Sequence, residues 1–279
     1  ASVVQEAEAS QKRINELLIQ KSDIINRNEN IYRLKGEIEF RNVSFVYPNT
    51  GIKALENVSF TVKSGEKVAI MGRTASGKTT IAELLTRMFD VTDGEILLDG
   101  MNIKDHNISI IRDQIGYVPQ DVFLFSDTIY ANIAFANPTI SQSDIEKYAG
   151  YASVYEDIMR LPDKFNTLVG ERGVTLSGGQ KQRISIARAF IKNPEIILLD
   201  DALSAVDTTT EQNIMSFFQK SLEHKTSFII SHRTNNLLGY DKIIVLEEGK
   251  IADSGTHEEL ISKQGFYSSV YQQQMMQQN

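Results

Sequence analysis

The 279-residue chain contains no cysteine and no long apolar run. Without cysteine it has neither a disulfide framework nor a thiolate metal site, which fits a reducing compartment. A membrane-spanning helix needs roughly 18–20 consecutive apolar residues, and no run approaches that length. The first residues, ASVVQE, show neither an initiator methionine nor a signal peptide, so we expect a domain cut from a longer polypeptide.

Basic residues are also in the minority. The formal net charge is −7, and the sequence has no cluster of Lys and Arg. A face that binds nucleic acid usually appears as a basic excess or a basic cluster, so we predict no nucleic-acid partner. Apolar residues make up 41% of the chain. At this length they can build the core of one large domain or of two small ones.

Residues 1–30 are predicted to form an amphipathic helix. The apolar residues that define its one modest stripe are Ile14, Leu17, Leu18, Ile24 and Ile25. Residues 26–30 are polar and end the pattern, so we place a linker near residues 26–35. The sequence therefore divides into a helix with a linker, residues 1–35, and a main domain, residues 36–279.

The main domain alternates short apolar runs with helical patterns. The strand-like runs are residues 36–45, 54–62, 67–71, 95–100, 116–120, 196–200, 227–231, 242–246 and 250–252. Helical patterns cover residues 79–88 and 126–161, whereas the glutamine-rich tail, residues 272–279, is expected to be frayed. Strands that alternate with helices predict an α/β fold with a mostly parallel sheet.

Residues 72–79, GRTASGKT, match the pattern G-x-x-x-x-G-K-[ST] between a buried strand and a helix. The glycines let the backbone wrap so that successive N–H groups point at phosphates, and the helix N-terminus adds the positive end of its dipole. Lys78 supplies a point charge, and Thr79 offers a hydroxyl to Mg²⁺. We predict a nucleotide site made of Gly72, Arg73, Thr74, Ala75, Ser76, Gly77, Lys78, Thr79 and Thr80.

Asp200 ends the buried strand-like run at residues 196–199. A carboxylate at this place can hold Mg²⁺ through its waters. Aspartate is also common in the turn after any strand, so Asp200 alone does not decide between the two interpretations. Together with the phosphate loop, it predicts a magnesium-binding aspartate.

Seven motifs occur in the order found in one family. They are Tyr47, residues 72–79, Gln120, the pentapeptide LSGGQ at residues 176–180, Asp200, the tetrapeptide SAVD at residues 204–207, and His232. From residue 36 to about residue 270, the chain resembles the nucleotide-binding domain of an ABC transporter. The resemblance implies a P-loop NTPase core of the α/β class, an antiparallel β subdomain, and an α-helical subdomain at about residues 121–190 that carries LSGGQ. It also implies ATP and Mg²⁺ as cofactors.

The resemblance gives each motif residue a role. Tyr47 would stack on adenine, although an ordinary strand tyrosine before Pro48 is the alternative. Gln120 would approach Mg²⁺ and the attacking water, and would couple the site to a membrane domain. The magnesium ligands would thus be Thr79, Gln120 and Asp200.

His232 would contact the γ-phosphate and orient the attacking water. Its place at the end of a buried strand puts it at the carboxyl edge of the sheet, where ligands bind, but a single histidine after a strand can also be structural. Asp207 would reach across a dimer interface toward the partner's phosphate loop. The general base of the family would stand directly after the magnesium aspartate, at Asp201.

The signature pentapeptide points to a second chain. Ser177, Gly178, Gly179 and Gln180 would cap the next helix, and their N–H groups would face a γ-phosphate. In the family, that phosphate is held by the other subunit, so that two ATP molecules are sandwiched head to tail. The partner would be a second nucleotide-binding domain, identical or homologous. A plain N-cap by serine has the same geometry without a ligand.

Two further segments resemble the exporter branch of the family: GERG at residues 170–173 and LFSDTI at residues 124–129. In an exporter, residues 1–30 would extend the last transmembrane helix of the same polypeptide, and the domain would lie on the cytoplasmic face of a membrane. The alternative is an N-terminal helix packed on the domain.

The sequence departs from the family at two positions. Asp201 replaces the usual glutamate, and its carboxylate falls back by about 1.5 Å, one carbon–carbon bond. A misplacement near 1 Å can cost on the order of 10²-fold in rate, so we expect a slow site unless backbone adjustment restores the distance. Ala75 replaces the usual glycine. We expect right-handed, helix-like backbone angles there and a small effect on nucleotide affinity.

The sequence therefore predicts the ATP-hydrolysing motor domain of a membrane exporter, monomeric without ATP. Two alternatives remain. A soluble ABC-type ATPase acting on DNA or ribosomes would carry coiled-coil insertions, tandem nucleotide domains or basic surfaces, which the sequence does not show. A regulatory binder that does not hydrolyse ATP is conceivable because of Asp201, but the presence of His232 and Gln120 argues against it.

Overall fold

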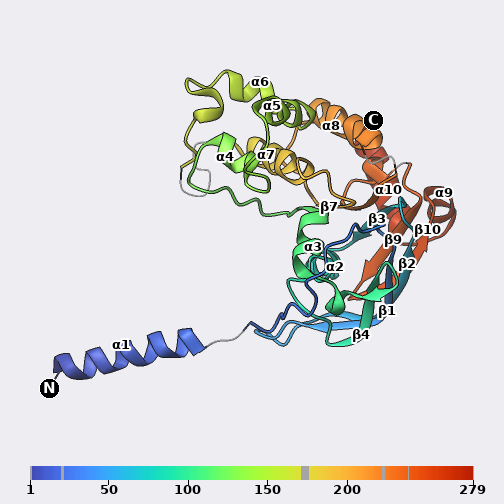
Figure 1. The fold of residues 1–279 in the computed structure, drawn as a ribbon. Coiled ribbons are helices and arrows are strands. Elements are labelled where there is room, and N and C mark those ends of the chain that lie inside the picture. The colour runs from blue at the N-terminus through green and yellow to red at the C-terminus, as the bar shows by residue number, and fades with distance from the viewer. Residues whose placement is uncertain (1, 20–21, 171–175, 222–223, 238, 279) are drawn as a thin grey trace.

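A six-stranded sheet forms the centre of the fold (Figure 1). The computed structural model describes residues 2–19, 22–170, 176–221, 224–237 and 239–278. The strands of this sheet are β3 (Lys67–Gly72), β6 (Ile115–Val118), β7 (Ile196–Asp200), β8 (Thr226–Ile230), β9 (Lys242–Glu247) and β10 (Lys250–Gly255). Their order is β10-β9-β3-β8-β7-β6, and all neighbours pair in parallel except β10 with β9. The predicted α/β fold with a mostly parallel sheet is confirmed.

A second, four-stranded sheet is antiparallel. Its strands are β1 (Ile38–Val46), β2 (Lys53–Val62), β4 (Asp93–Leu98) and β5 (Met101–Asn102). They lie in the order β2-β1-β4-β5. The register is interrupted by irregularities between Phe40 and Val46 on β1, which twist this strand away from a flat ladder.

Helices cover the sheets. They are α1 (Ser2–Ile19), α2 (Lys78–Leu85), α3 (Ile108–Gln114), α4 (Ile129–Ala134), α5 (Gln142–Tyr151), α6 (Tyr155–Met159), α7 (Gly178–Phe190), α8 (Thr208–Ser221), α9 (His257–Ser262) and α10 (Phe266–Gln278), with short 3-10 turns η1 (Ile103–Asp105), η2 (Lys164–Asn166) and η4 (Thr234–Leu237). In Figure 1, α4 to α7 gather on one side of the six-stranded sheet, in green and yellow.

Successive residues of the central strands face two different cores. On β3, Val68 and Ile70 pack with the antiparallel sheet and α2, whereas Ala69 and Met71 pack with the helices that include α4, α5 and α7. Every residue of β7 is buried. Burial on both faces is why these strands read as continuous apolar runs in the sequence rather than as alternating patterns.

Helix α1 extends away from the rest of the molecule (Figure 1), and its described side chains are exposed. The alternative of a helix packed on the domain is therefore not what the structure shows. The predicted helix was also too long, because Ile24 and Ile25 lie beyond its end at Ile19. The Ser22 hydroxyl bonds to the N–H and the carbonyl of Ile24, and such local bonds compete with helix formation. Within the described residues, no helix is both long and apolar enough to cross a bilayer.

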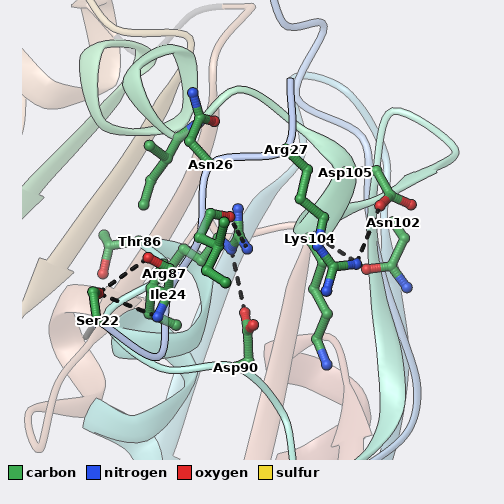
Figure 2. Close-up of polar contacts among 12 residues, drawn as sticks. Ser22, Ile24, Asn26, Arg27, Thr86, Arg87, Asp90, Asn102, Lys104 and Asp105 are labelled. Atoms are coloured by element: carbon green, nitrogen blue, oxygen red, sulfur yellow. Dashed lines mark hydrogen bonds and ion pairs between the residues drawn. The ribbon is translucent and has the colours of Figure 1, made fainter. Parts of the chain in front are cut away.

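The linker after α1 runs along the domain and is held by polar contacts (Figure 2). Arg87, which is 1% exposed, donates through Nη2 to the Ile25 carbonyl at 3.0 Å and through Nε to Asp90 Oδ1 at 3.2 Å. The Asn26 side chain accepts from the N–H of Ile108 at 3.0 Å. A buried guanidinium thus fixes the place where the linker meets the domain.

The C-terminal tail is helical, not frayed as expected. Helix α10 continues to Gln278. Glutamine has a good helix propensity, and Gln274 makes hydrogen bonds to a distant loop. Tertiary contacts of this kind cannot be read from the composition of the tail.

Replacing Arg87 with alanine is expected to release the linker. The variant loses the charged donor that holds Ile25 and Asp90, and a hydrogen bond made by a charged group contributes about 1.5–3 kcal/mol. Hydrogen–deuterium exchange should rise in peptides that cover residues 22–30, and the urea-unfolding midpoint should fall. Arg27→Ala is the matched control, because Arg27 meets Asp105 at 3.8 Å between two exposed side chains. Equal exchange in both variants would contradict this role of Arg87.

Candidate functional site

A cavity of about 270 Å³ lies at the carboxyl edge of the six-stranded sheet. It brings together most of the residues predicted from the sequence. The lining consists of Tyr47, Ile52, Lys53, Ala54, Thr74, Ala75, Ser76, Gly77, Lys78, Thr79, Thr80, Gln120, Asp200, Asp201, Ile230 and His232. Gly72 ends β3, and Arg73 follows it outside the lining.

The phosphate loop depends on a close approach at Gly77, the residue that caps α2. Its φ is +97°, and a Cβ atom there would lie 2.4 Å from the carbonyl oxygen of Ala54. Any other residue would meet this backbone oxygen as well as the strain of a positive φ. The first residues of α2, Lys78, Thr79 and Thr80, line the cavity, where their N–H groups can donate to phosphate oxygens.

Two donors of the loop are arranged for an anion. Lys78 is 7% exposed, and its Nζ donates to the carbonyls of Gly72 at 3.0 Å and Arg73 at 2.7 Å. Burial lowers the pKa of Lys78, while Asp200 and Asp201 oppose this shift. The Ser76 hydroxyl is buried without a hydrogen-bond partner. A buried donor without a partner is costly, and a phosphate oxygen would satisfy it.

The backbone angles expected for Ala75 were wrong, whereas the small effect expected on nucleotide affinity stays a prediction. Its φ is +63°, in the left-handed region rather than the helix-like region. An L-residue other than Asn or Asp pays roughly 1–2 kcal/mol for this conformation. The loop is therefore strained at the position where the family usually has glycine.

Asp200 ends β7 with its carboxylate inside the cavity. The residue is 1% exposed, and its Oδ2 has no hydrogen-bond partner. Burial raises the pKa of this carboxyl, and Asp201 adds to the rise, whereas the Thr79 hydroxyl and Lys78 oppose it. A buried oxygen without a partner, beside a threonine hydroxyl and the amide of Gln120, is the donor set that a hard cation such as Mg²⁺ prefers.

Asp201 and His232 follow neighbouring strands. The N–H of Asp201 donates to the Ile230 carbonyl at 2.9 Å, and its φ of +46° is one that aspartate tolerates better than most residues. Partial burial lowers the pKa of His232 below its ordinary 6.5, and the charge of Lys78 lowers it further, against the opposing effect of Asp201. The imidazole is therefore neutral at pH 7.

Tyr47 directly follows β1 and lines the cavity. Its hydroxyl donates to Glu83 Oε2 at 2.6 Å and pairs with Thr80 Oγ1 at 2.9 Å. Burial, together with Glu83, raises the pKa of Tyr47 to about 12. The residue is thus fixed at the rim of the cavity, and its stacking on adenine stays a prediction. Sequence reasoning missed Glu83, because nothing in the motif reveals a partner 36 positions away.

The signature pentapeptide lies elsewhere. Ser177 caps α7: its Oγ accepts from the N–H of Gln180 at 3.2 Å, and Gln180 Oε1 accepts from the N–H of Ser177 at 3.0 Å. Ser177 and Gly178 are exposed, and none of the residues 176–180 lines the cavity. The capped helix end is therefore turned to solvent and away from the phosphate loop of its own chain.

The signature helix is also tied to the SAVD segment. The side chain of Gln182 donates to Ser204 Oγ at 3.1 Å and accepts from the N–H of Ala205 at 3.1 Å. A Cβ atom on Gly179 would lie 2.8 Å from the Ala205 carbonyl oxygen, so only glycine fits there. These contacts were not predicted, because glutamine just inside a helix carries no local signal.

Two predictions remain, those for Asp207 and for the GERG segment. Asp207 accepts at Oδ1 from the N–H of Thr210 at 3.0 Å and thereby caps α8; it does not line the cavity. In the GERG segment, residues 171–173 lie outside the described residues.

Replacing Asp200 with asparagine is expected to stabilise the chain in the absence of Mg²⁺ and nucleotide. A carboxyl with a raised pKa in the folded state adds stability only while it is protonated, and this contribution is lost as the pH rises through the folded pKa. Asparagine stays neutral, so the variant should unfold at a higher temperature than the wild type at pH 7, with the difference shrinking toward about pH 4. Thermal unfolding between these pH values measures it.

Asp207→Asn is the control of opposite sign. Hydrogen bonding by Thr210 lowers the pKa of Asp207, so its ionised form favours the folded state, and this variant should not gain stability at pH 7. A lower unfolding temperature of Asp200→Asn at pH 7 would contradict the account of the buried carboxylate.

Comparisons with known proteins agree with this arrangement. The family model of the ABC transporter matches residues 55–204. The ATP-dependent lipid A-core flippase of Photobacterium profundum is 43% identical over 257 residues, which cover 92% of this chain and 44% of that protein. An uncharacterized ABC transporter ATP-binding protein of Bacillus subtilis, YknU, is 41% identical over 268 residues, with coverages of 95% and 46%.

A solved structure is also similar. The bacterial Atm1-family ABC exporter with ATP bound superposes with a TM-score of 0.90 at 36% identity, covering 97% of this chain and 48% of that one. The chain thus spans less than half the length of each of these relatives. The phosphate loop at the edge of a parallel sheet, the capped LSGGQ helix and these matches together show that the chain belongs to the ABC transporter family, as an ATP-binding domain of the exporter type.

Proposed function

We propose that the domain is the ATP-hydrolysing motor of a membrane exporter, and that it works as a dimer closed around two ATP molecules. The exposed signature supports this proposal. Ser177 and Gly178 present a helix N-terminus to solvent, although no residue of LSGGQ lines the cavity of its own chain. Such a terminus is suited to bind phosphate, and the phosphate within its reach would be held by a second chain.

Each motif residue that lines the cavity then has a task in hydrolysis. The phosphate loop and Lys78 hold the β- and γ-phosphates, and Tyr47 holds the base. Thr79, Gln120 and Asp200 would bind Mg²⁺, which neutralises charge on the phosphates when bound. His232, neutral at pH 7, donates a hydrogen bond to the γ-phosphate.

Asp201 would accept the proton of the water that attacks the γ-phosphorus. Its carboxylate is shorter than that of the usual glutamate, so we expect a slow site. The slow site and the intact signature belong to different active sites of a dimer, because the signature completes the partner's site. We infer that the domain pairs with a homologous domain that carries glutamate, which would make the two sites of the exporter unequal.

The relatives support a proposal about the surroundings of the domain, because they are transporters of about twice its length or more. We propose that a transmembrane domain of the same polypeptide precedes it and that it lies on the cytoplasmic face of a membrane. Helix α1, which extends away from the body of the domain (Figure 1), would continue the last transmembrane helix. The transported substrate would be bound by the membrane part.

A regulatory role without hydrolysis is the second candidate, and Asp201 is the observation that favours it. In that case, the domain would still bind MgATP and close a dimer. Neither the wild-type chain nor an Asp201→Glu variant would hydrolyse ATP.

Light scattering tests the dimer. The chain should be a monomer of about 31.4 kDa without nucleotide. Its mass should double with MgATP, because each copy carries both a phosphate loop and a signature helix and can stand in for the homologous partner. Ser177→Arg should abolish the dimer and leave ATP binding to the monomer unchanged, because Ser177 does not line the cavity. Lys78→Ala should lose both. A stable dimer without nucleotide, or a loss of monomer binding in Ser177→Arg, would refute the proposal.

Lengthening the base tests the slow site. Asp201→Glu should hydrolyse ATP at least about 10-fold faster than the wild-type chain, since a misplacement near 1 Å costs up to about 10²-fold. Asp201→Asn keeps the length and removes the proton acceptor, so it should be slower than both. Steady-state release of phosphate at saturating MgATP measures all three. Equal turnover of wild type and Asp201→Glu would show that the backbone already restores the distance.

A further inference from the structure

We propose that Gln274 on α10 is a positioning residue for His232, and that α10 braces the loop of His232 beside the phosphate loop. The proposal rests on the proposed function for what His232 does, but its structural part concerns the nucleotide-free chain alone. Gln274 lies in the glutamine-rich tail, outside every motif that identifies the family.

The carboxamide of Gln274 makes three hydrogen bonds to this loop. Its Nε2 donates to the carbonyl oxygen of His232 at 2.7 Å. Its Oε1 accepts from the N–H of Thr234 at 2.9 Å and from the hydroxyl of Thr234 at 2.8 Å. One side chain therefore holds both sides of residue 233. It uses a donor and an acceptor at once, which the two atoms of an amide group provide side by side.

Other contacts hold Arg233, the residue of the loop between His232 and Thr234. The Ser231 hydroxyl accepts from the N–H of Arg233 at 3.0 Å. Arg233 forms an ion pair with Glu211 on α8, a helix that begins directly after Asp207. These contacts fix Arg233. Among the hydrogen bonds described in the structure, the only side chain that donates to the carbonyl of His232 is that of Gln274. The backbone from which the imidazole extends thus depends on α10.

Helix α10 is itself held in place by contacts near its N-terminal end. Tyr267 is 2% exposed, and its hydroxyl lies 2.6 Å from Nδ1 of His257. The guanidinium of Arg73, in the phosphate loop, lies over the ring of Phe266 at 5.8 Å. Phe266 and Gln274 are about 12 Å apart along the helix at 1.5 Å per residue. One rigid helix therefore contacts both the start of the phosphate loop and the loop of His232.

Losing the amide would let the imidazole shift while the residues that hold the rest of the nucleotide stay in place. The phosphate loop, Tyr47 and Asp200 do not contact Gln274 in any described hydrogen bond. We therefore expect an effect on the rate of hydrolysis rather than on affinity. A displacement near 1 Å costs up to about 10²-fold in rate, and an intermediate loss of about 10-fold is expected for a loop that keeps its other contacts.

The test compares Gln274→Glu and Gln274→Ala with Gln272→Ala, an exposed glutamine of the same helix. Glutamate keeps the acceptor for Thr234 and replaces the donor to His232 with an oxygen. In the nucleotide-free chain, both Gln274 variants should show faster hydrogen–deuterium exchange over residues 231–237 and a shifted imidazole NMR signal of His232. With MgATP, kcat should fall about 10-fold while KM stays within about two-fold. Gln272→Ala should match the wild type in all three measurements.

The outcomes separate this proposal from the proposed function. If the wild-type chain neither binds nor hydrolyses ATP, the proposed function fails, and exchange and the imidazole signal still decide the role of Gln274. Unchanged exchange and an unchanged signal in both Gln274 variants would overturn the proposal, as would a rise in KM with kcat unchanged. Should these variants unfold, Thr234→Val is the alternative, because it removes the hydrogen bond from the Thr234 hydroxyl to Gln274. It should shift the NMR signal of His232, whereas Thr234→Ser keeps a hydroxyl and should give the wild-type signal.

Discussion

Burial of the six-stranded sheet on both faces is the constraint from which the geometry of the site follows. Parallel strands that are buried on both sides must keep their register, because a slip by one residue would exchange the two cores. Ile70 pairs with Ile230, and Ile230 pairs with Asp200. The chain therefore leaves β3, β7 and β8 at one level of the sheet. The phosphate loop, the two aspartates and the loop of His232 meet there as a consequence of packing.

Side-chain contacts outside the motifs then hold the segments around this sheet in place. Arg87 fixes the linker at the N-terminal side, and Gln182 ties the signature helix to Ala205. Gln274 reaches the loop of His232 from the last helix. In each of these hydrogen bonds, a side chain contacts a backbone group of another segment. Such a bond positions that segment without constraining its sequence. The parts of the chain that carry no chemistry of their own therefore set the geometry of the parts that do.

The sequence was sufficient for what is local. Continuous apolar runs predicted the buried strands, and the spacing of glycines and Lys78 predicted the phosphate loop, because each depends on neighbours within a few positions. Long-range contacts could not be predicted. The partner of Tyr47 is Glu83, 36 positions away, and Gln274 contacts a loop 42 positions away. The φ of Ala75 also depends on the closure of the whole loop, so the sequence indicated the residue but not its strain.

The electrostatics of the cavity explain why a ligand belongs there. Burial raises the pKa of Asp200 and lowers those of Lys78 and His232, so that each shift disfavours the charged form of its group. Without ligand, the folded chain holds a carboxylate and an ammonium at a cost, together with a Ser76 hydroxyl that has no partner. A polyphosphate would favour the charged lysine, and a divalent cation would favour the charged aspartate. Binding of the two together would therefore remove the cost that folding imposes on the empty site, which couples affinity for the metal nucleotide to the stability of this edge of the sheet.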